Sequence, residues 1–231
     1  MPQTTLPTIF AQPALRALLA LATAAALHLL TPAFAQAASA PPPLHVRGTI
    51  VSSSATSITV ATPSGTDQIA LGPHPRILGI VNSSLANVGA GDYIGTTVVP
   101  QANGSLRALE VHIFPASLKG TGEGFYAWDK QQQSMMANAT VQNVATRSSM
   151  MANATVQSLG SGAAGRTVQL TYNGGTKTVT IPPNVPVVAL RPGSKALLTA
   201  GAHVFVIATR DSSGLVATGV NVGENGVVPP M

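Results

Sequence analysis

Glu110, His112 and Glu123 are the residues of this sequence best suited to hold a metal ion. Glu110 and His112 lie two residues apart in a segment with the composition of a strand, so their side chains share one face. Imidazole and carboxylate groups bind transition metals. The pair makes only half a site, and the other histidines of the chain have no carboxylate at a useful spacing. The sequence therefore predicts no metal and no other cofactor, with these three residues as the nearest candidates.

Four methionines occur in two adjacent pairs, Met135–Met136 and Met150–Met151. Thioethers suit Cu(I), which gives these pairs a chemical interpretation. Adjacent residues on a strand point to opposite faces, however, so the two sulfurs of a pair cannot converge on one ion. We expect no copper site here.

Aromatic side chains are concentrated in one short stretch. Phe125, Tyr126 and Trp128 lie within four residues of each other, and Asp129 follows directly. Such a cluster can stack on sugar rings or on a partner protein if it is exposed. It can equally fold back and seal a cleft between two domains. We predict these four residues as partner-binding and keep the packing interpretation as its alternative.

The sequence offers no constellation typical of an enzyme. It has no cysteine, which excludes thiolate nucleophiles and disulfides. No Gly-x-Ser-x-Gly turn follows a strand. The glycine-rich segment 120–124 lacks the preceding strand and following helix that shape a phosphate loop. Glu123 and Asp129, six residues apart in a loop, are too generic to indicate a hydrolase pair. We therefore predict a protein that is not an enzyme.

Composition points to strands as the elements that position these residues. The chain has 231 residues, 22 of them Gly and 18 Pro, and only 8% are charged. This composition, rich in Val, Thr, Ser and Ala, is typical of an exported β-protein. The formal charge of +5 comes from basic residues scattered singly. Nucleic-acid binding requires a basic cluster, so we expect no nucleic-acid partner.

The first 35 residues have the pattern of a secretory signal peptide. Arg16 precedes an apolar run that extends to Leu30, and Ala33-Phe34-Ala35 supplies a small-x-small cleavage site. Cleavage as late as residue 40 fits a second such site. The apolar run is shorter than the roughly 20 residues of a transmembrane span. We predict a periplasmic protein without a membrane span after signal removal.

A strand–turn–strand unit occurs twice in the sequence, at Leu85–Ile113 and at Leu197–Val222. Two copies of such a unit imply two copies of one small domain. Each copy is about 70 residues long with about six short strands, which suits a closed barrel. The sequence therefore predicts an all-β fold of two tandem OB-like barrels with short helical turns, at 44–114 and 153–224. A Pro-rich tail at 225–231 completes the chain.

The segment between the predicted barrels, 115–152, is an aromatic and Gly-rich linker containing a second duplication. SMMANATVQ at 134–142 recurs unchanged at 149–157. Only one copy can be the first strand of the second barrel. The later copy runs directly into the following strands, so we expect it to form that strand. The earlier copy is then an insert or an additional edge strand.

Several motifs resemble a known family. Arg47-Gly-Thr-Ile-Val, the turn Gly91-Asp92-Tyr93-Ile94 and Leu106-Arg-Ala-Leu-Glu-Val are similar to an exported bacterial family of domains of unknown function with OB-like small β-barrels. The linker and the Pro-Pro-Met tail resemble its two-barrel subgroup, sometimes labelled metal ABC transporter permease. A permease needs several spans, and this chain offers one at most.

The resemblance implies a fold and a compartment but no activity. Members of the subgroup are expected to carry a His and a Pro between Gly124 and Trp128, where this chain has Phe125-Tyr126-Ala127. The loop therefore lacks the residues that would support a metal role. We predict a non-enzymatic binding or scaffold protein of the cell envelope, with an envelope protein or a glycan as partner. The alternative is a periplasmic protein that binds a metal or a small ligand, and an envelope hydrolase comes last.

Overall fold

The computed structural model describes residues 42–146 and 165–231. Within them the chain forms thirteen strands and three single-turn 3-10 helices, at Leu85–Asn87, Ala116–Leu118 and Lys195–Leu197. The predicted all-β class is confirmed, together with the helical turns that precede each repeated hairpin. The predicted signal peptide, the later SMMANATVQ copy and the strand expected at 153–157 lie outside the described residues.

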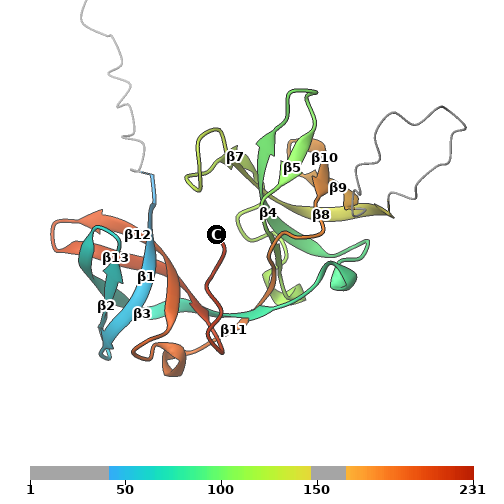
Figure 1. Ribbon diagram of the computed structural model, residues 1–231. Helices are drawn as coiled ribbons and strands as arrows, with labels where there is room; N and C mark the ends of the chain where they lie inside the picture. Colours follow the sequence, from blue (N-terminus) through green and yellow to red (C-terminus); the bar gives the residue numbers. More distant parts are fainter. Residues whose placement is uncertain (1–41, 147–164) are drawn as a thin grey trace, which may run out of the picture. The chain divides into compact units, whose positions relative to one another are not determined.

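Five strands close into a barrel (Figure 1). They are β1 (Leu44–Ser53), β2 (Ser57–Thr62), β3 (Gly65–Asn82), β12 (His203–Asp211) and β13 (Gly214–Gly223). Neighbouring strands pair antiparallel in the order β13-β12-β1-β2-β3. β3 then pairs in parallel with β13, which closes the ring. Closure leaves no strand edge of this sheet unpaired.

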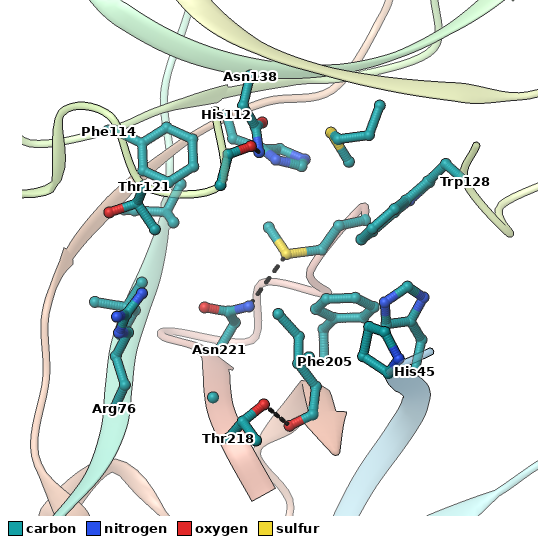
Figure 2. Close-up of a pocket in the computed structure, with 18 of the residues that line it drawn as sticks. His45, Arg76, His112, Phe114, Thr121, Trp128, Asn138, Phe205, Thr218 and Asn221 are labelled. Atoms are coloured by element: carbon teal, nitrogen blue, oxygen red, sulfur yellow. Dashed lines mark hydrogen bonds between the residues drawn. The ribbon is translucent and has the colours of Figure 1, made fainter. Parts of the chain in front are cut away.

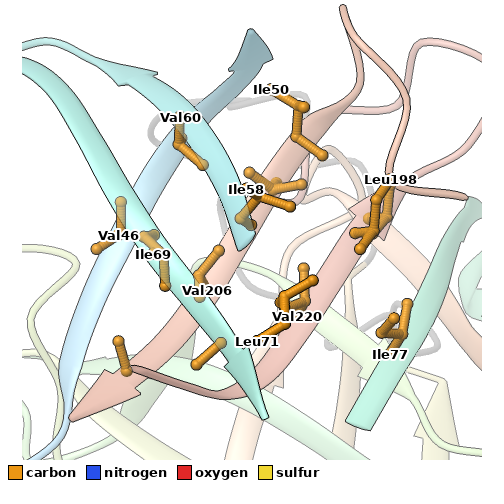
Figure 3. Close-up of a cluster of buried hydrophobic side chains, with 14 of the residues drawn as sticks. Val46, Ile50, Ile58, Val60, Ile69, Leu71, Ile77, Leu198, Val206 and Val220 are labelled. Atoms are coloured by element: carbon orange, nitrogen blue, oxygen red, sulfur yellow. The ribbon is translucent and has the colours of Figure 1, made fainter. Parts of the chain in front are cut away.

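The interior of this barrel is filled by inward-facing residues that alternate along each of its five strands (Figure 3). Ile58 and Val60 alternate with exposed or half-buried neighbours along β2, and Ile69 and Leu71 do the same along β3. Ile58, Val60 and Ile69 are fully buried. Each such side chain contributes about 1.5–3 kcal/mol through removal from water. The period-two alternation of these strands is therefore also the source of their stability.

The proline-containing segment 72–75 interrupts the pairing without ending the strand. β13 pairs with β3 up to Ala217↔Leu71 and resumes at Gly219↔Arg76, so four residues of β3 have no partner in β13. Proline lacks the N–H that a ladder requires, which explains the gap. Residues 72–75 thus form a bulged stretch inside one long strand.

A second group of strands contains the middle of the chain. It comprises β4 (Tyr93–Pro100), β5 (Leu106–Ala108), β6 (Val111–Ile113), β7 (Gly124–Ala127), β8 (Met135–Thr146), β9 (Arg166–Tyr172), β10 (Gly175–Ile181) and β11 (Val187–Pro192). β4, β5, β10, β9 and β8 pair in that order, and β8 also pairs with β4. Their apolar residues form a separate core. The Asn103-Gly104 turn joins β4 to β5, with Gly104 at φ 78°.

The two repeats exchange their hairpins. β12 and β13 of the second repeat pair with β1 and β3 of the first, and β4 and β5 of the first repeat pair with β8 and β10 of the second. The two hairpins have the same register. Phe205 pairs with Asn221 between β12 and β13, and the equivalent residues Gly95 and His112 pair between β4 and β6. The predicted tandem arrangement, with one barrel inside 44–114 and another inside 153–224, is not confirmed, because the closed barrel combines both ends of the described chain.

The earlier copy of the duplicated nonapeptide forms most of β8. β8 pairs with β4, β7 and β9, so it lies inside the sheet. The interpretation of 134–142 as an insert or edge strand is therefore wrong. Two identical segments have identical local preferences, so only long-range pairing could decide between them. Phe125 and Tyr126 pair with β8 through β7, which gives the predicted linker a regular structure.

A third apolar cluster lies where β3 and β11 pair antiparallel around Leu190↔Ile80. These two residues occupy equivalent positions in the two repeats. The cluster also contains Phe205 of β12 and Met231, and Phe114 and Trp128 pack against it. It is the only one of the three clusters that draws on both strand groups within the described residues.

Candidate functional site

A cavity of about 480 Å³ opens beside this third cluster (Figure 2). Its apolar lining includes Leu78, Phe114, Met136, Leu190, Phe205 and Met231. Cavities of roughly 300–1,000 Å³ with mainly apolar walls and a few polar groups are typical of small-molecule sites. The arrangement is therefore the leading candidate for a functional site in the part of the chain that the structure describes.

Trp128 forms an aromatic wall of the cavity together with His45 and Phe205. The ring centroids of Trp128 and His45 are 4.3 Å apart, and those of Trp128 and Phe205 are 6.0 Å apart. Trp128 follows β7 and is fixed by its own backbone: its N–H donates to the Ser134 carbonyl at 2.9 Å, and the Ser134 hydroxyl donates to its carbonyl at 2.8 Å. The wall is thus built before any ligand arrives.

Asp129 secures the aromatic wall to β1. Its carboxylate accepts hydrogen bonds from Arg47 Nη1 at 3.2 Å and Nη2 at 2.7 Å, and His45 Nδ1 lies 3.0 Å from its Oδ1. Burial raises the pKa of Asp129, but the hydrogen bonds and charges of Arg47 and His45 lower it by more. Arg47 Nε also donates to the Met231 carbonyl oxygen at 2.8 Å. One guanidinium therefore holds the linker and the tail against the barrel.

Polar side chains also line the cavity. Asn221 Nδ2 lies 3.5 Å from the Met231 sulfur, and the Thr218 hydroxyl donates to the Ile207 carbonyl at 3.0 Å. Arg76 lies across the cavity from Trp128 and Phe205 in Figure 2. Its side chain is exposed and forms no hydrogen bond or ion pair with another described residue.

Glu110 is a fully buried carboxylate behind the cavity wall. Its Oε1 accepts from the Thr97 hydroxyl at 2.5 Å, and its Oε2 accepts from Lys130 Nζ at 2.8 Å. His112 Nε2 lies 3.1 Å from Oε1. Burial raises the pKa of Glu110, but His112, Lys130 and Thr97 together lower it by more, so the net pKa is below its usual value. The carboxylate is ionised at neutral pH.

Three buried polar atoms have no hydrogen-bond partner among the described residues, and all three belong to residues that line the cavity. They are His112 Nε2, Trp128 Nε1 and Asn138 Oδ1. His112 Nε2 is close to Glu110 but not aligned with it for a hydrogen bond. Each buried unpaired group costs about 1–3 kcal/mol. Such costs are expected at functional sites, where stability is secondary.

The predicted metal candidates come together only in part. Glu110 and His112 are in contact, but Glu123 is elsewhere, with its Oε1 accepting from the Asn173 backbone N–H at 2.7 Å. The oxygens of Glu110 are occupied by Thr97 and Lys130. Within residues 42–146 and 165–231, no group of three or more His, Cys, Asp or Glu is arranged to hold a metal ion.

The predicted partner-binding residues face different surroundings. Phe125 packs on the core of the second strand group, stacks with Tyr172 at 6.3 Å and carries Lys177 over its ring. Trp128 and Asp129 contact the closed barrel, and Tyr126, 38% exposed, lies at the cavity. The two residues of the Met135–Met136 pair also have different surroundings. Met136 lines the cavity, and Met135 packs against the core of the second strand group. The four linker residues therefore do not present one continuous surface.

Sequence reasoning did not identify Arg76, Phe205, Asn221 or Met231 as site residues. Arg76 comes from β3, whereas Phe205, Asn221 and Met231 come from the β12–β13 hairpin and the tail, and the pairing of this hairpin with β1 and β3 brings them together. One signal was available: His112 and Asn221 hold equivalent positions in the two repeats, and both are polar residues in otherwise apolar strand ends.

Comparison of the chain with protein-family models, curated proteins and solved structures gives no match. Among the described residues, no helix has the length and apolar character to cross a membrane. Function must therefore be inferred from the cavity and its chemistry.

Proposed function

We propose that the protein is a non-enzymatic binding protein that holds a small, largely apolar molecule in this cavity. The observation that carries the proposal is the cavity itself, about 480 Å³ in volume and walled by aromatic and aliphatic side chains from both strand groups. Apolar enclosure provides affinity, and a few fixed polar groups provide orientation. Of the two binding functions predicted from the sequence, this favours the small-ligand protein over the scaffold.

The groups around the cavity support binding rather than catalysis. His45 and His112 each lie against a carboxylate that is itself paired with a cation. The Thr218 hydroxyl donates to a backbone carbonyl, and no described hydroxyl on the cavity wall is bonded to a histidine or carboxylate. An activated nucleophile requires such a base.

Trp128 provides a direct test because it is the single tryptophan of the chain. Titration with N-phenyl-1-naphthylamine, a neutral apolar dye, should quench Trp128 emission and increase dye emission with one saturable phase. Met136→Phe, which adds volume to the cavity wall, should weaken dye binding about tenfold, equivalent to about 1.4 kcal/mol. Val51→Phe adds a ring to a residue that is 53% exposed and should have no effect. Absence of saturable binding, or equal affinity in the two variants, would refute the proposal.

We also infer that the second strand group is a barrel like the first and that both are OB-like, with their hairpins exchanged between the repeats. The support is the ring of pairings β4-β5-β10-β9-β8-β4 and its register, which repeats that of the closed barrel. Leu106↔Val179 corresponds to Leu215↔Ile69. The resemblance to the exported two-barrel family fits this architecture. Export to the periplasm through residues 1–35 belongs to the same proposal.

A further inference from the structure

We propose that the molecule bound in this cavity carries a carboxylate on an apolar body, and that Arg76 binds that carboxylate. The inference rests on the proposed function, because it names the chemical class of the cavity's ligand. It follows from three features of the cavity: the charges on its wall, the position of Arg76, which is unpaired among the described residues, and the open space beside it.

The charges on the wall are unequal. His45, Arg76 and His112 are the lining side chains able to carry a positive charge, and no described Asp or Glu lines the cavity. A nitrogen of His45 lies 3.0 Å from the Asp129 carboxylate, and a nitrogen of His112 lies 3.1 Å from the Glu110 carboxylate. Arg76 has no such partner among the residues that the structure describes. An anion in the cavity would therefore meet an uncompensated guanidinium.

The apolar and cationic ends of the cavity lie opposite each other. Figure 2 shows Arg76 on one side and Trp128, Phe205 and His45 on the other, with Asn221 between them. An apolar chain placed against Trp128 and Phe205 would direct its head group toward Arg76. A guanidinium binds a carboxylate with two parallel N–H···O bonds, which fixes the orientation of the head group.

There is room for a head group beside Arg76. Its partner in the parallel register of β3 and β13 is Gly219, which has no side chain. A Cβ placed on Gly219 would meet only the tip of Ile207, at 3.9 Å. Because Arg76 is exposed, water screens its charge, so we expect the carboxylate to strengthen binding by about three- to tenfold rather than more.

Three ligands with the same ten-carbon chain test the proposal: decanoate, decanol and decyltrimethylammonium. Each is titrated at pH 7.5 against the full protein loaded with N-phenyl-1-naphthylamine, and displacement is followed by dye emission. We expect decanoate to bind about three- to tenfold tighter than decanol, and decyltrimethylammonium to bind weakest. In Arg76→Gln, the preference for decanoate over decanol should disappear. Arg210→Gln removes an exposed cation of the same barrel away from the cavity and should preserve the preference.

The outcomes separate this inference from the proposed function. Equal binding of decanoate and decanol by the wild-type protein would overturn the role of the anion but leave the apolar cavity as a binding site. A preference that survives in Arg76→Gln, or that disappears equally in Arg210→Gln, would overturn the role of Arg76. Failure of the dye and all three ligands to bind would overturn the function itself.

Discussion

Replacement of Glu110 by glutamine should destabilise the protein strongly at neutral pH. The carboxylate is fully buried, and it accepts hydrogen bonds from Thr97 and Lys130. Glutamine preserves the shape but removes the charge and turns an N–H toward the ammonium of Lys130. Removal of one partner of a buried pair costs about 3–5 kcal/mol. Lys130 is 29% exposed and can turn toward water, so we expect a smaller loss of about 2–3 kcal/mol.

The loss of stability in Glu110→Gln should be smaller at low pH than at neutral pH. The pKa of Glu110 is lower in the folded protein than in the unfolded chain. The carboxylate therefore stabilises the fold above the unfolded pKa of about 4.3, and this contribution disappears as the pH falls through the lowered folded pKa. Glutamine does not titrate. The difference between wild type and Glu110→Gln should be full at pH 7 and should decrease below about pH 4.

Thermal unfolding, followed by circular dichroism at a series of pH values, measures this difference. For a unit of this size, 1 kcal/mol shifts Tm by about 2–4 °C, so Glu110→Gln should unfold about 5–10 °C below wild type at pH 7. Glu123→Gln is the matched control, because Glu123 accepts a single backbone hydrogen bond near the surface. Equal Tm values at pH 7, or a gap that stays constant down to pH 3, would refute the assigned role of Glu110.

Two further predictions concern the closed barrel. Thr49→Cys with His203→Cys should form a disulfide on oxidation, because these residues are directly paired across β1 and β12 and the chain has no other cysteine. In a tandem barrel, β1 would instead pair with β4, so Thr49→Cys with Tyr93→Cys is the control pair and should stay reduced in the monomer. A disulfide in the control pair and none in the first pair, seen on a non-reducing gel, would contradict the exchange of hairpins. Gly48→Ala should lower the free energy of unfolding by more than about 2 kcal/mol in a urea titration, since its Cβ would collide with a backbone oxygen of β2. Gly72→Ala meets no atom within 4 Å and should change stability by less than about 0.5 kcal/mol.

Local sequence patterns were sufficient to predict most strands. Alternation in Thr66–Leu71, β-branched residues in Ser57–Ala61 and the Asn103-Gly104 turn each act over a few residues. Such signals determine which residues face inward and where the chain turns. They are independent of the partner strand, so they hold in either a tandem or an exchanged arrangement.

Strand partners could not be predicted in the same way. β12 has equivalent residues in β4, so β1 could pair with either hairpin by local criteria. The copies at 134–142 and 149–157 are identical, so no local criterion at all predicts which of them pairs with a given strand. The choice depends on the length and packing of the connecting segments, which no local pattern encodes. The tandem prediction assumed that each repeat folds on itself, and this assumption determined the expected bounds of both barrels.

The site was predictable only where its residues are close in sequence. Glu110 directly precedes β6 and His112 lies in it, and their proximity followed from their spacing of two residues. Trp128 and Asp129 were identified by composition, but their inward contacts with His45 and Arg47 depend on pairing across 80 residues or more. Arg76 carried no signal at all, because a single exposed arginine is common on any surface.

Differences in sequence between equivalent positions of the two strand groups explain why the cavity has one cationic side. In the register of β13 with β3, Gly219 lies beside Arg76. The equivalent residues of the other repeat are Glu110 and Pro186, which directly precede the β6–β11 pairing. The Pro186 carbonyl accepts a hydrogen bond from the Val111 N–H. In one repeat the position holds a buried carboxylate that is paired with Lys130. In the other it holds a glycine beside an unpaired arginine. These two differences leave a glycine beside an unpaired arginine on the cavity wall, which is the asymmetry that an apolar molecule with a single anionic end requires.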